Sequence, residues 1–488
     1  MVNGTRARWL AMMVLCLGDL MIVLDTNIVN VALPSIQADL GFSQSTLAWV
    51  VNAYMLTFGG FLLLSGRLGD LLGNRRVFTT GVVAFTAASV SCGLAPSPVL
   101  LVVARAVQGL GGAAVSAVAL ALIVGLFQEP AERAKARGVF GFVMSGGGAL
   151  GVFLGGVLTG LLSWQWIFWV NVPIGVAVVV LVGRCLPADV VEARGQRLDV
   201  PGAGLVTLGL VLAVYAIVGT VDAGWTSMRT LGLLVAAVAL VAAFVVREAT
   251  AAFPLVPLRL FTLRNVAVSQ LVGVLWAGAM FASFFLSALY LQQVQGYDAL
   301  RVGLAYLPSC VVMAICSLGL SDRLVMRFGI RPPLAVGLML AAVALVLFAR
   351  MPVDGSYVLD VLPPMVLLGL GAGIAFNPVL LAAMGDVEPH EAGLASGVVN
   401  TAFMMGGALG LAVLVSLSSW RTEALTTAGS PATEALAGGL RVGFAVGALM
   451  AAAAAVAGAA LLRPRPMTPP DEPQPVPEAR PLTTVSQP

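Results

Sequence analysis

Three charged side chains lie inside long apolar stretches of this 488-residue sequence: Asp19, Asp25 and Arg105. The two acids belong to WLAMMVLCLGDLMIVLDTNIVNVALP, and Arg105 belongs to VVARAVQGLGGAA. An ionised Asp or Arg near the middle of a membrane costs at least about 2.5–3.5 kcal/mol, so each must face the protein interior or a water-filled cavity. A carboxylate there can take up and release a proton, and a guanidinium can balance its charge. We therefore predict that Asp25, Arg105 and Asp19 take part in proton coupling.

Asp25 has two competing interpretations. It is either a permanently hydrogen-bonded acid that holds helices together, or an acid that exchanges protons, as intramembrane acids commonly do. Burial favours the neutral form of a carboxylic acid and a neighbouring guanidinium favours the charged form, so the two influences can balance. For Asp19 both interpretations stay open. Six residues separate the two acids, which turns them about 120° from each other on a helix; Asn27 and Asn30 give the end of that segment a polar lining.

The composition indicates which elements must position these residues. Hydrophobic residues make up 59% of the chain and charged residues 10%, whereas soluble proteins contain about 25% charged residues. About 20 apolar residues are needed for a helix to cross the hydrocarbon core. The sequence therefore predicts an all-α membrane protein that crosses the plasma membrane many times. We expect fourteen spans, at residues 9–33, 46–66, 77–95, 98–127, 137–161, 166–184, 201–221, 230–247, 265–291, 302–321, 333–350, 361–384, 392–417 and 439–462.

Positive charges in the loops orient these spans, because Lys and Arg accumulate on the cytoplasmic side. With both termini in the cytoplasm, 20 of the 26 Lys and Arg residues fall in inside segments and 5 in outside loops. The inside loop DVEPHE, 386–391, is acidic and departs from this pattern. The longest loops, near 185–200, 248–264 and 418–438, are too short for a soluble domain. The proline-rich segment that follows the last span is expected to be a disordered cytoplasmic tail.

Two further patterns concern movement between helices. Gly147, Gly151, Gly155 and Gly156 give the fifth span a thin face, which predicts either ordinary close packing or a hinge or seal between two halves of the molecule. The second pattern is the inside loop GRLGDLLGNRR, 66–76. It is either a basic loop typical of the cytoplasmic side or a gating network, and its candidate gating residues are Gly66, Asp70, Gly73, Arg75 and Arg76.

Other classes of function lack their residues. A phosphate-binding loop needs G-x-x-x-x-G-K-[ST], but Ala136 follows the only lysine, Lys135. There is one histidine, His390, and the five cysteines form no C-x-x-C pair. No GxSxG motif or metal constellation indicates a membrane enzyme. We therefore expect no enzyme activity, no metal, no cofactor, no ATP and no nucleic-acid partner; hydropathy alone does not distinguish a transporter from a channel.

Several separate motifs resemble those of the fourteen-helix drug:proton antiporters of the major facilitator superfamily, the bacterial multidrug efflux type. LDTNIVNVALP is similar to the family's helix 1 signature, GRLGDLLGNRR to its loop 2–3 signature and RAVQGLGGAA to its helix 4 signature. The glycines of the fifth span resemble the antiporter signature, WQWIFWVNVPIG the start of helix 6, and YLQQVQGYDALRVGLAYLP the helix 9–10 connection. Three positions depart from the family: Val152 replaces a usual proline, Asn27 a common threonine and Gln165 a common arginine.

The resemblance implies a major facilitator fold, with two six-helix bundles related by a pseudo-twofold axis and two additional central helices. The implied division is an N-terminal bundle at 1–184, a two-helix insertion at 185–264, a C-terminal bundle at 265–462 and a tail at 463–488. A faint internal echo agrees, since GNRR after the second span recurs as GIRP at 329–332.

The resemblance also implies a function. It is proton-coupled efflux, by alternating access, of drugs or other small, often cationic or amphipathic molecules, which confers drug resistance. The protein would be a monomer driven by the proton-motive force, with the substrate, protons and the bilayer as partners. Proton-coupled uptake or export of a specific metabolite or organic acid is the alternative, and the direction of transport distinguishes it from drug efflux. We expect polar and aromatic residues to line the substrate cavity: Asn27, Asn30, Trp49, Tyr54, Phe58, Trp276, Phe281 and Phe284.

Overall fold

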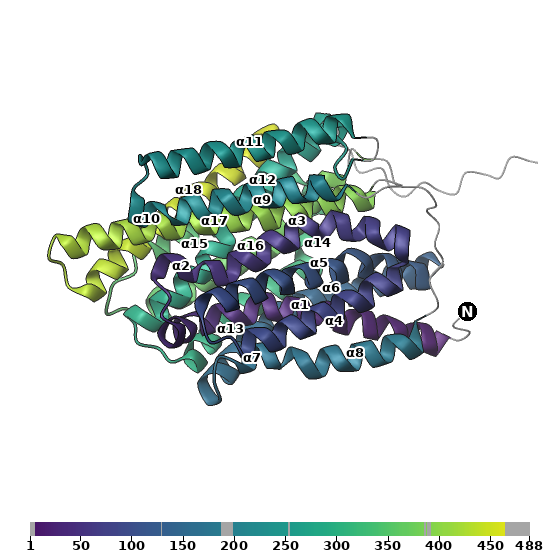
Figure 1. The fold of residues 1–488 in the computed structure, drawn as a ribbon, viewed down its shortest axis with the longest axis horizontal. Coiled ribbons are helices and arrows are strands. Elements are labelled where there is room, and N and C mark those ends of the chain that lie inside the picture. The colour runs from purple at the N-terminus through teal and green to yellow at the C-terminus, as the bar shows by residue number, and fades with distance from the viewer. Residues whose placement is uncertain are drawn as a thin grey trace, which may run out of the picture.

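The computed structural model describes residues 5–127, 129–186, 199–251, 254–384, 387 and 392–463. In these ranges the chain forms long helices that run side by side (Figure 1), and no strand is present. The expected all-α architecture is therefore confirmed. The acidic segment 388–391, most of the loop 185–200 and the proline-rich tail from residue 464 lie outside the described residues.

The N-terminal part of the chain builds eight helices. They are α1 (Thr5–Leu40), α2 (Gln44–Leu47), α3 (Trp49–Leu72), α4 (Asn74–Gly93), α5 (Pro98–Leu126), α6 (Pro130–Leu161), α7 (Trp166–Trp169) and α8 (Asn171–Cys185). Local sequence sets several of these boundaries. Ser97 caps α5 by accepting a hydrogen bond from the Leu100 N–H, with Pro98 in the first turn, as expected for a helix start.

The middle and C-terminal parts follow the same pattern. The middle part contains α9 (Val200–Val218), α10 (Thr220–Ala223) and α11 (Met228–Thr250). The C-terminal part contains η1 (Leu258–Thr262), α12 (Arg264–Leu289), η2 (Tyr290–Val294), α13 (Ala299–Ile315), η3 (Cys316–Leu320), α14 (Ser321–Phe328), α15 (Arg331–Phe348), η4 (Tyr357–Val361), α16 (Leu362–Met384), α17 (Ala392–Thr427) and α18 (Ala432–Leu461). η2, η3 and η4 are π-helical turns.

Each of the fourteen predicted spans overlaps one long helix of the described residues. Within the described part of the chain, eleven helices are long and apolar enough to cross a membrane, so the chain is a multi-span membrane protein; fourteen crossings stay a prediction. The largest difference lies at 418–438, which we predicted to be a loop. There α17 continues to Thr427 and α18 begins at Ala432, so the two helices project as a hairpin at the left of Figure 1. Hydropathy marks the end of the apolar stretch, whereas these helices continue in polar sequence.

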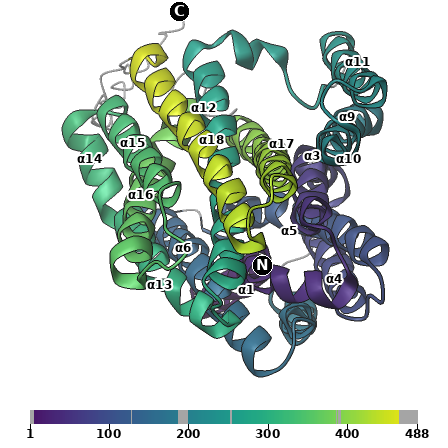
Figure 2. The same ribbon diagram turned by 90° about the vertical axis from the view of Figure 1, so that its left-hand side faces the viewer.

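The helices pack in two groups. α1, α3, α4, α5, α6 and α8 contact one another, and α12 to α18 form the second group. The groups meet where α3 packs on α17 and α6 packs on α13. α9 packs on α3 and α17, with α11 outside it (Figure 2), so the two additional helices are central in the sequence but peripheral in the fold. The exact domain boundaries stay a prediction.

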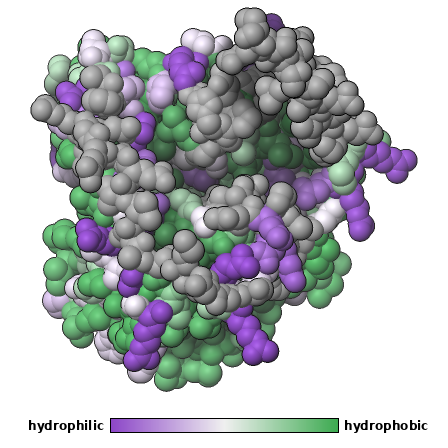
Figure 3. Space-filling view, turned by 90° about the vertical axis from the view of Figure 1, so that its right-hand side faces the viewer, coloured by the Kyte–Doolittle hydropathy of each residue, from purple (hydrophilic) through white to green (hydrophobic). Residues whose placement is uncertain are grey.

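We name the two ends of the bundle after the ends of α1. The Thr5 end contains the start of α1 and the connection between α3 and α4, whereas the Leu40 end contains α2, α7, η2 and the α17–α18 hairpin. Hydrophilic side chains gather on the face of the Thr5 end (Figure 3), while the sides carry exposed apolar residues such as Met228, Val235 and Val238 of α11. This distribution fits helices whose sides face lipid.

One backbone feature recurs in the two groups. Gly73 ends α3 with φ 99° and Gly329 ends α14 with φ 78°. Glycine adopts positive φ without the steric cost that a side chain brings, which suits it to a helix end. The recurrence supports the predicted echo between GNRR and GIRP.

Candidate functional site

Asp25 lies at the centre of a buried hydrogen-bond network. Its Oδ2 accepts a hydrogen bond from Arg105 Nη1 at 2.5 Å, and its Oδ1 accepts from Gln108 Nε2 at 2.7 Å and Asn171 Nδ2 at 3.1 Å. Arg105 also donates to Gln108 Oε1 at 2.6 Å and to the carbonyl oxygen of Val50 at 2.9 Å. All four side chains are at most 1% exposed. The structure therefore pairs Arg105 with an acid of the first span and with a backbone carbonyl, wholly inside the N-terminal group of helices.

A hydroxyl and two aromatic rings complete the surroundings of this pair. Gln108 Nε2 also donates to Ser89 Oγ at 2.8 Å. The guanidinium carbon of Arg105 lies 4.5 Å from the centre of the Tyr54 ring and 5.7 Å from that of Phe168, within the range of a cation–π interaction. These groups replace the water that two charges lose on burial.

Five helices bring the network together: α1 supplies Asp25, α3 the Val50 carbonyl, α4 Ser89, α5 Arg105 and Gln108, and α8 Asn171. Arg105 and Gln108 are three residues apart and so share one face of α5. Glycine allows α5 to approach α4, since a Cβ on Gly111 would lie 2.6 Å from the backbone N of Phe85. Sequence reasoning did not assign Ser89 or Asn171 a role, although an asparagine inside WQWIFWVNVPIG was an available signal.

The network is balanced in charge, which determines its chemistry. Removing one partner of a buried ion pair typically costs about 3–5 kcal/mol, because the other charge is left uncompensated. A proton delivered to Asp25 would have the same effect on Arg105, whose remaining acceptors are Gln108 Oε1 and the Val50 carbonyl. The pair can therefore link protonation to a rearrangement of the five helices that hold it.

Asp19 has very different surroundings. It lies about 9 Å from Asp25 along the axis of α1. Its Oδ1 accepts a hydrogen bond from Ser116 Oγ of α5 at 2.7 Å, and its Oδ2 is buried without a hydrogen-bond partner. The side chain is 1% exposed, and none of the ion pairs seen among the described residues includes it. A buried carboxylate without a counter-charge is costly as an anion.

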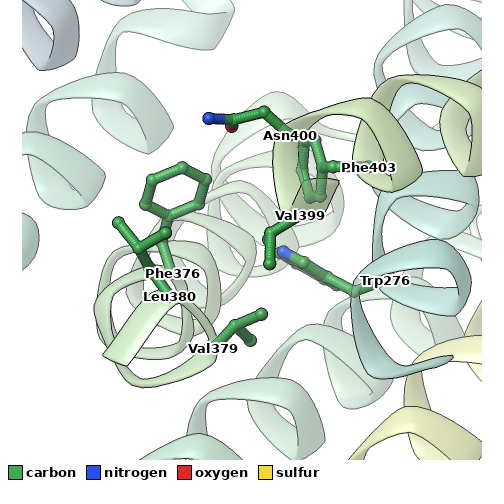
Figure 4. Close-up of a pocket in the computed structure, with 7 residues that line it drawn as sticks. All are labelled: Trp276, Phe376, Val379, Leu380, Val399, Asn400 and Phe403. Carbon is green, nitrogen blue, oxygen red and sulfur yellow. The ribbon is translucent and has the colours of Figure 1, made fainter. Parts of the chain in front are cut away.

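An apolar cleft lies between α12, α16 and α17 (Figure 4). It leaves a free volume of about 20 Å³, room for about one water molecule, and is lined by Trp276, Phe376, Val379, Leu380, Val399, Asn400 and Phe403. None of these residues is charged. Trp276 is 1% exposed, and its indole Nε1 is buried without a hydrogen-bond partner. The cleft thus presents an apolar, largely aromatic lining with a single buried donor, and it would have to widen to take more than a water molecule.

Trp276 and Phe281 are the predicted cavity residues closest to this cleft. Trp276 lines it, and the Phe281 ring centre lies 5.8 Å from that of the lining residue Phe403. Phe284 lies elsewhere in α12 and stacks on Tyr306, with ring centres 5.6 Å apart. The lining residues of α16 and α17 were not predicted, because an apolar residue in an apolar helix gives no indication of which way it points.

The other predicted cavity residues belong to the first two spans. Asn27 and Asn30 donate to carbonyl oxygens one turn earlier in α1, at 2.8 and 3.4 Å. Phe58 stacks on Tyr54 with ring centres 5.7 Å apart, so both aromatics belong to the surroundings of Arg105. Trp49 is half-buried at the start of α3. The structure brings none of these five into the cleft of Figure 4.

The glycines of the fifth span lie against two helices. Gly147, Gly151 and Gly155 face α1, and a Cβ would lie 2.9 Å from the Leu24 carbonyl oxygen at Gly151 and 2.7 Å from that of Ile28 at Gly155. Gly156 instead faces α13 of the other group, where a Cβ would lie 3.0 Å from the Cα of Gly303. This run therefore combines close packing within one group with close packing between the two groups.

The candidate gating residues Gly66, Asp70, Gly73, Arg75 and Arg76 lie at the Thr5 end. Gly73 ends α3, and Arg75 Nη2 donates to the carbonyl oxygen of Gly183 in α8 at 3.2 Å. Asp70 and Arg76 are exposed. A gating role for this loop stays a prediction.

Comparison with known proteins shows the family. Residues 15–411 match the model described as Major Facilitator Superfamily, and the chain belongs to this superfamily. It is a transporter and not an enzyme. It is 40% identical over 452 residues to the puromycin resistance protein pur8 of Streptomyces alboniger, covering 91% of this chain and 89% of that protein. It is 38% identical to the cephamycin export protein CmcT of Amycolatopsis lactamdurans, with 86% of each chain covered.

Solved structures agree on the fold. A bacterial homologue of the human lysosomal transporter Spinster superposes with a TM-score of 0.67 at 16% identity, over 94% of this chain and 98% of that one. The expected fold is thereby confirmed. In the described part of the chain, no group of three or more His, Cys, Asp or Glu side chains could hold a metal ion.

Proposed function

We propose that this protein exports drugs and other small amphipathic molecules across the bacterial plasma membrane in exchange for protons, and so confers resistance. The relatives named for puromycin resistance and cephamycin export favour export over uptake of a nutrient. The observation that carries proton exchange is Asp19, a buried carboxylate with an unpartnered oxygen and no ion pair. Such an acid in a transmembrane helix marks a proton pathway more often than a structural contact.

The two acids of α1 take different parts in the proposed cycle. Asp19 binds the proton, because no cation pairs with its buried carboxylate and protonation removes that uncompensated charge. Asp25 holds Arg105 and with it α4, α5 and α8. Whether Asp25 and Arg105 are paired therefore depends on the arrangement of the N-terminal helices. A proton that passes from Asp19 to Asp25 would break the pair and favour the other arrangement. One charge moved through the whole membrane supplies about 2.3 kcal/mol per 100 mV.

The cleft of Figure 4 supports the choice of substrate. Once the cleft widens, its aromatic lining and single buried donor would suit an amphipathic molecule with an apolar ring and a hydrogen-bond acceptor. The basic loops support an orientation with the Thr5 end in the cytoplasm and the Leu40 end outside. The cleft opens within the C-terminal helices, while both acids lie in the N-terminal helices, so substrate and proton would act through the contact between the two groups.

Inside-out membrane vesicles provide the test. With a proton gradient imposed, vesicles that contain the wild-type protein should accumulate radiolabelled puromycin, and a protonophore should abolish the accumulation. Asp19→Asn should still exchange labelled for unlabelled puromycin but should no longer respond to the gradient. Ser116→Ala is the matched control, because it removes the hydrogen-bond partner of Asp19 and keeps the acid.

The outcomes separate the parts of the proposal. Gradient-driven accumulation by Asp19→Asn equal to that of the wild type would exclude Asp19 as the proton site. Failure of the wild type to accumulate puromycin or any tested drug, together with uptake in whole cells, would exclude efflux. Trp276→Phe keeps the ring and removes the donor, so it should weaken binding of puromycin while leaving gradient coupling intact.

A further inference from the structure

The two groups of helices are joined by side-chain hydrogen bonds at the Leu40 end. Gln292 Nε2 of η2 donates to the backbone carbonyl oxygen of Val31 in α1 at 2.8 Å. Beside it, Gln293 Nε2 donates to Gln37 Oε1 at 2.7 Å. Both bonds connect the C-terminal group to the helix that carries Asp19 and Asp25. The first is partly buried, whereas the second is exposed.

A proline explains why a backbone carbonyl of α1 can accept such a bond. Pro34 lies inside α1, three residues after Val31. It has no N–H to bond the carbonyl oxygen of Asn30, so the hydrogen-bond ladder of α1 lacks one bond beside Val31. A carbonyl oxygen has two lone pairs, so that of Val31 can accept the bond from Gln292 beside this gap in the ladder.

A π-helical turn places Gln292 opposite this carbonyl. α12 ends at Leu289 and continues as η2 from Tyr290 to Val294. The wider turn is closed by the Gln295 N–H, which donates to the carbonyl oxygen of Tyr290 at 3.0 Å. π-Helical turns occur mostly at functional positions, because the extra residue redirects the side chains that follow.

The far side of η2 is fixed to its own group. The hydroxyl of Tyr290 donates to the carbonyl oxygen of Pro352, and Gln295 Nε2 donates to that of Val353 at 3.0 Å. The loop that follows α15 therefore holds η2 while Gln292 reaches across to α1. At another point of the contact between the two groups, their backbones approach each other closely, at Gly156 of α6 and Gly303 of α13.

We propose that Gln292 is a positioning residue of the transport cycle: its bond to the Val31 carbonyl holds the Leu40 end closed while the Thr5 end receives substrate. This bond, which we call the latch, must break whenever α1 separates from η2. It therefore sets the balance between the form in which the Leu40 end is closed and the form in which it is open. This inference rests on the proposed alternating access, but the closure itself can be measured without transport. The exposed bond of Gln293 to Gln37 competes with water and contributes little to the balance.

Disulfide cross-linking measures the closure. Gly160 of α6 and Leu300 of α13 face each other across the groups, and a Cβ on Gly160 would lie 3.3 Å from the Leu300 Cβ. That separation is close to the Cβ–Cβ distance of a disulfide. Gly160→Cys and Leu300→Cys would be introduced after the five native cysteines have been replaced by serine or alanine. The rate of oxidative cross-linking then reports how often the Leu40 end is closed.

The expected changes follow from the worth of one hydrogen bond. Gln292→Met keeps the length of the side chain and removes the donor, so the ratio of closed to open forms should fall about two- to tenfold. Cross-linking should slow accordingly, and labelling of the same cysteines by an external, impermeant maleimide should rise. Gln292→Glu, which is isosteric but cannot donate when ionised, should give at least the same change. Gln293→Met is the matched control and should change neither rate.

The results decide the proposal. Unchanged cross-linking and labelling in Gln292→Met would overturn it, and so would an equal change in Gln293→Met. A second readout excludes a merely structural effect. The turnover rate for puromycin should change, while the unfolding midpoint of the purified protein should stay close to that of the wild type. If cross-linking shifts as expected while the wild type shows no proton-driven transport, the latch stands and the proposed antiport fails.

Discussion

The pairing of Asp25 with Arg105 makes a quantitative prediction about stability. Arg105→Gln would leave the Asp25 carboxylate with the amide donors of Gln108 and Asn171 but without a counter-charge. Asp25→Asn would leave the guanidinium uncompensated and would bring an amide N–H against one of the donors that now point at the carboxylate. Because both groups are at most 1% exposed, each single change should lower the free energy of unfolding by about 3–5 kcal/mol.

The double variant Asp25→Asn with Arg105→Gln should behave differently. Two neutral amides can hydrogen-bond to each other, and no buried charge remains, so its loss should be smaller than that of either single variant. The coupling energy between the two positions should therefore reach at least about 3 kcal/mol. Reversible unfolding of the purified protein in mixed detergent micelles, followed by circular dichroism, would provide the four free energies of the cycle.

A second pair in the same molecule is the control. Arg8 and Glu132 form an ion pair at 2.9 Å whose side chains are 29% and 25% exposed. A partly exposed pair is screened by solvent, so the cycle Arg8→Gln with Glu132→Gln should give a coupling of less than about 1 kcal/mol. Additive losses in the buried cycle, or equal coupling in the two cycles, would refute the view that burial makes the Asp25–Arg105 pair indispensable.

Glycines at tight and at open positions allow two further matched comparisons. Gly73→Ala forces a Cβ into a positive-φ conformation and should destabilise the protein by at least about 1 kcal/mol, whereas Gly66→Ala, with nothing within 4 Å of its Cβ, should be neutral or stabilising, as thermal unfolding would show. Gly151→Ala brings a Cβ within 2.9 Å of the Leu24 carbonyl oxygen and should cost about 1–3 kcal/mol and slow transport. Gly148→Ala meets an ordinary contact at 3.7 Å and should retain both stability and transport; equal losses at Gly148 and Gly151 would contradict the close packing of α6 on α1.

The residues that sequence reasoning found share one property. Asp25 and Arg105 are costly in a membrane, so their presence demanded a partner, and the structure brings the two together. Ser89 and Asn171 complete the same network but carry no charge, so no comparable cost drew attention to them. The signal that located the site is the free energy of burying an ion, and neutral polar residues give only a weak version of it.

The sequence did not reveal which face of each helix points into the protein and which points to lipid. In a soluble helix, polar residues mark the outer face, but in a membrane both lipid and the protein interior are apolar. Tyr54 and Phe58 therefore looked as suitable for a cavity as Trp276, although Tyr54 packs on Arg105 and Phe58 stacks on Tyr54. Phe376 and Phe403 line the cleft and gave no signal at all. The end of the apolar stretch at 418 also did not mark the end of α17, because that helix continues in polar sequence to Thr427.

One helix connects all the elements of the proposed cycle. α1 carries both acids, and its own residues Leu24 and Ile28 pack on the glycines of α6. Three residues after Ile28, its Val31 carbonyl accepts the bond from Gln292. Between Asp19 and Val31 it is an uninterrupted helix without a proline, and Pro34 follows only after Val31. A rotation of α1 that follows the loss of the Asp25–Arg105 bond would therefore reach Val31 without being absorbed on the way. Proton binding and closure of the Leu40 end are then linked by the stiffness of this one helix, which requires no contact between the acids and the latch themselves.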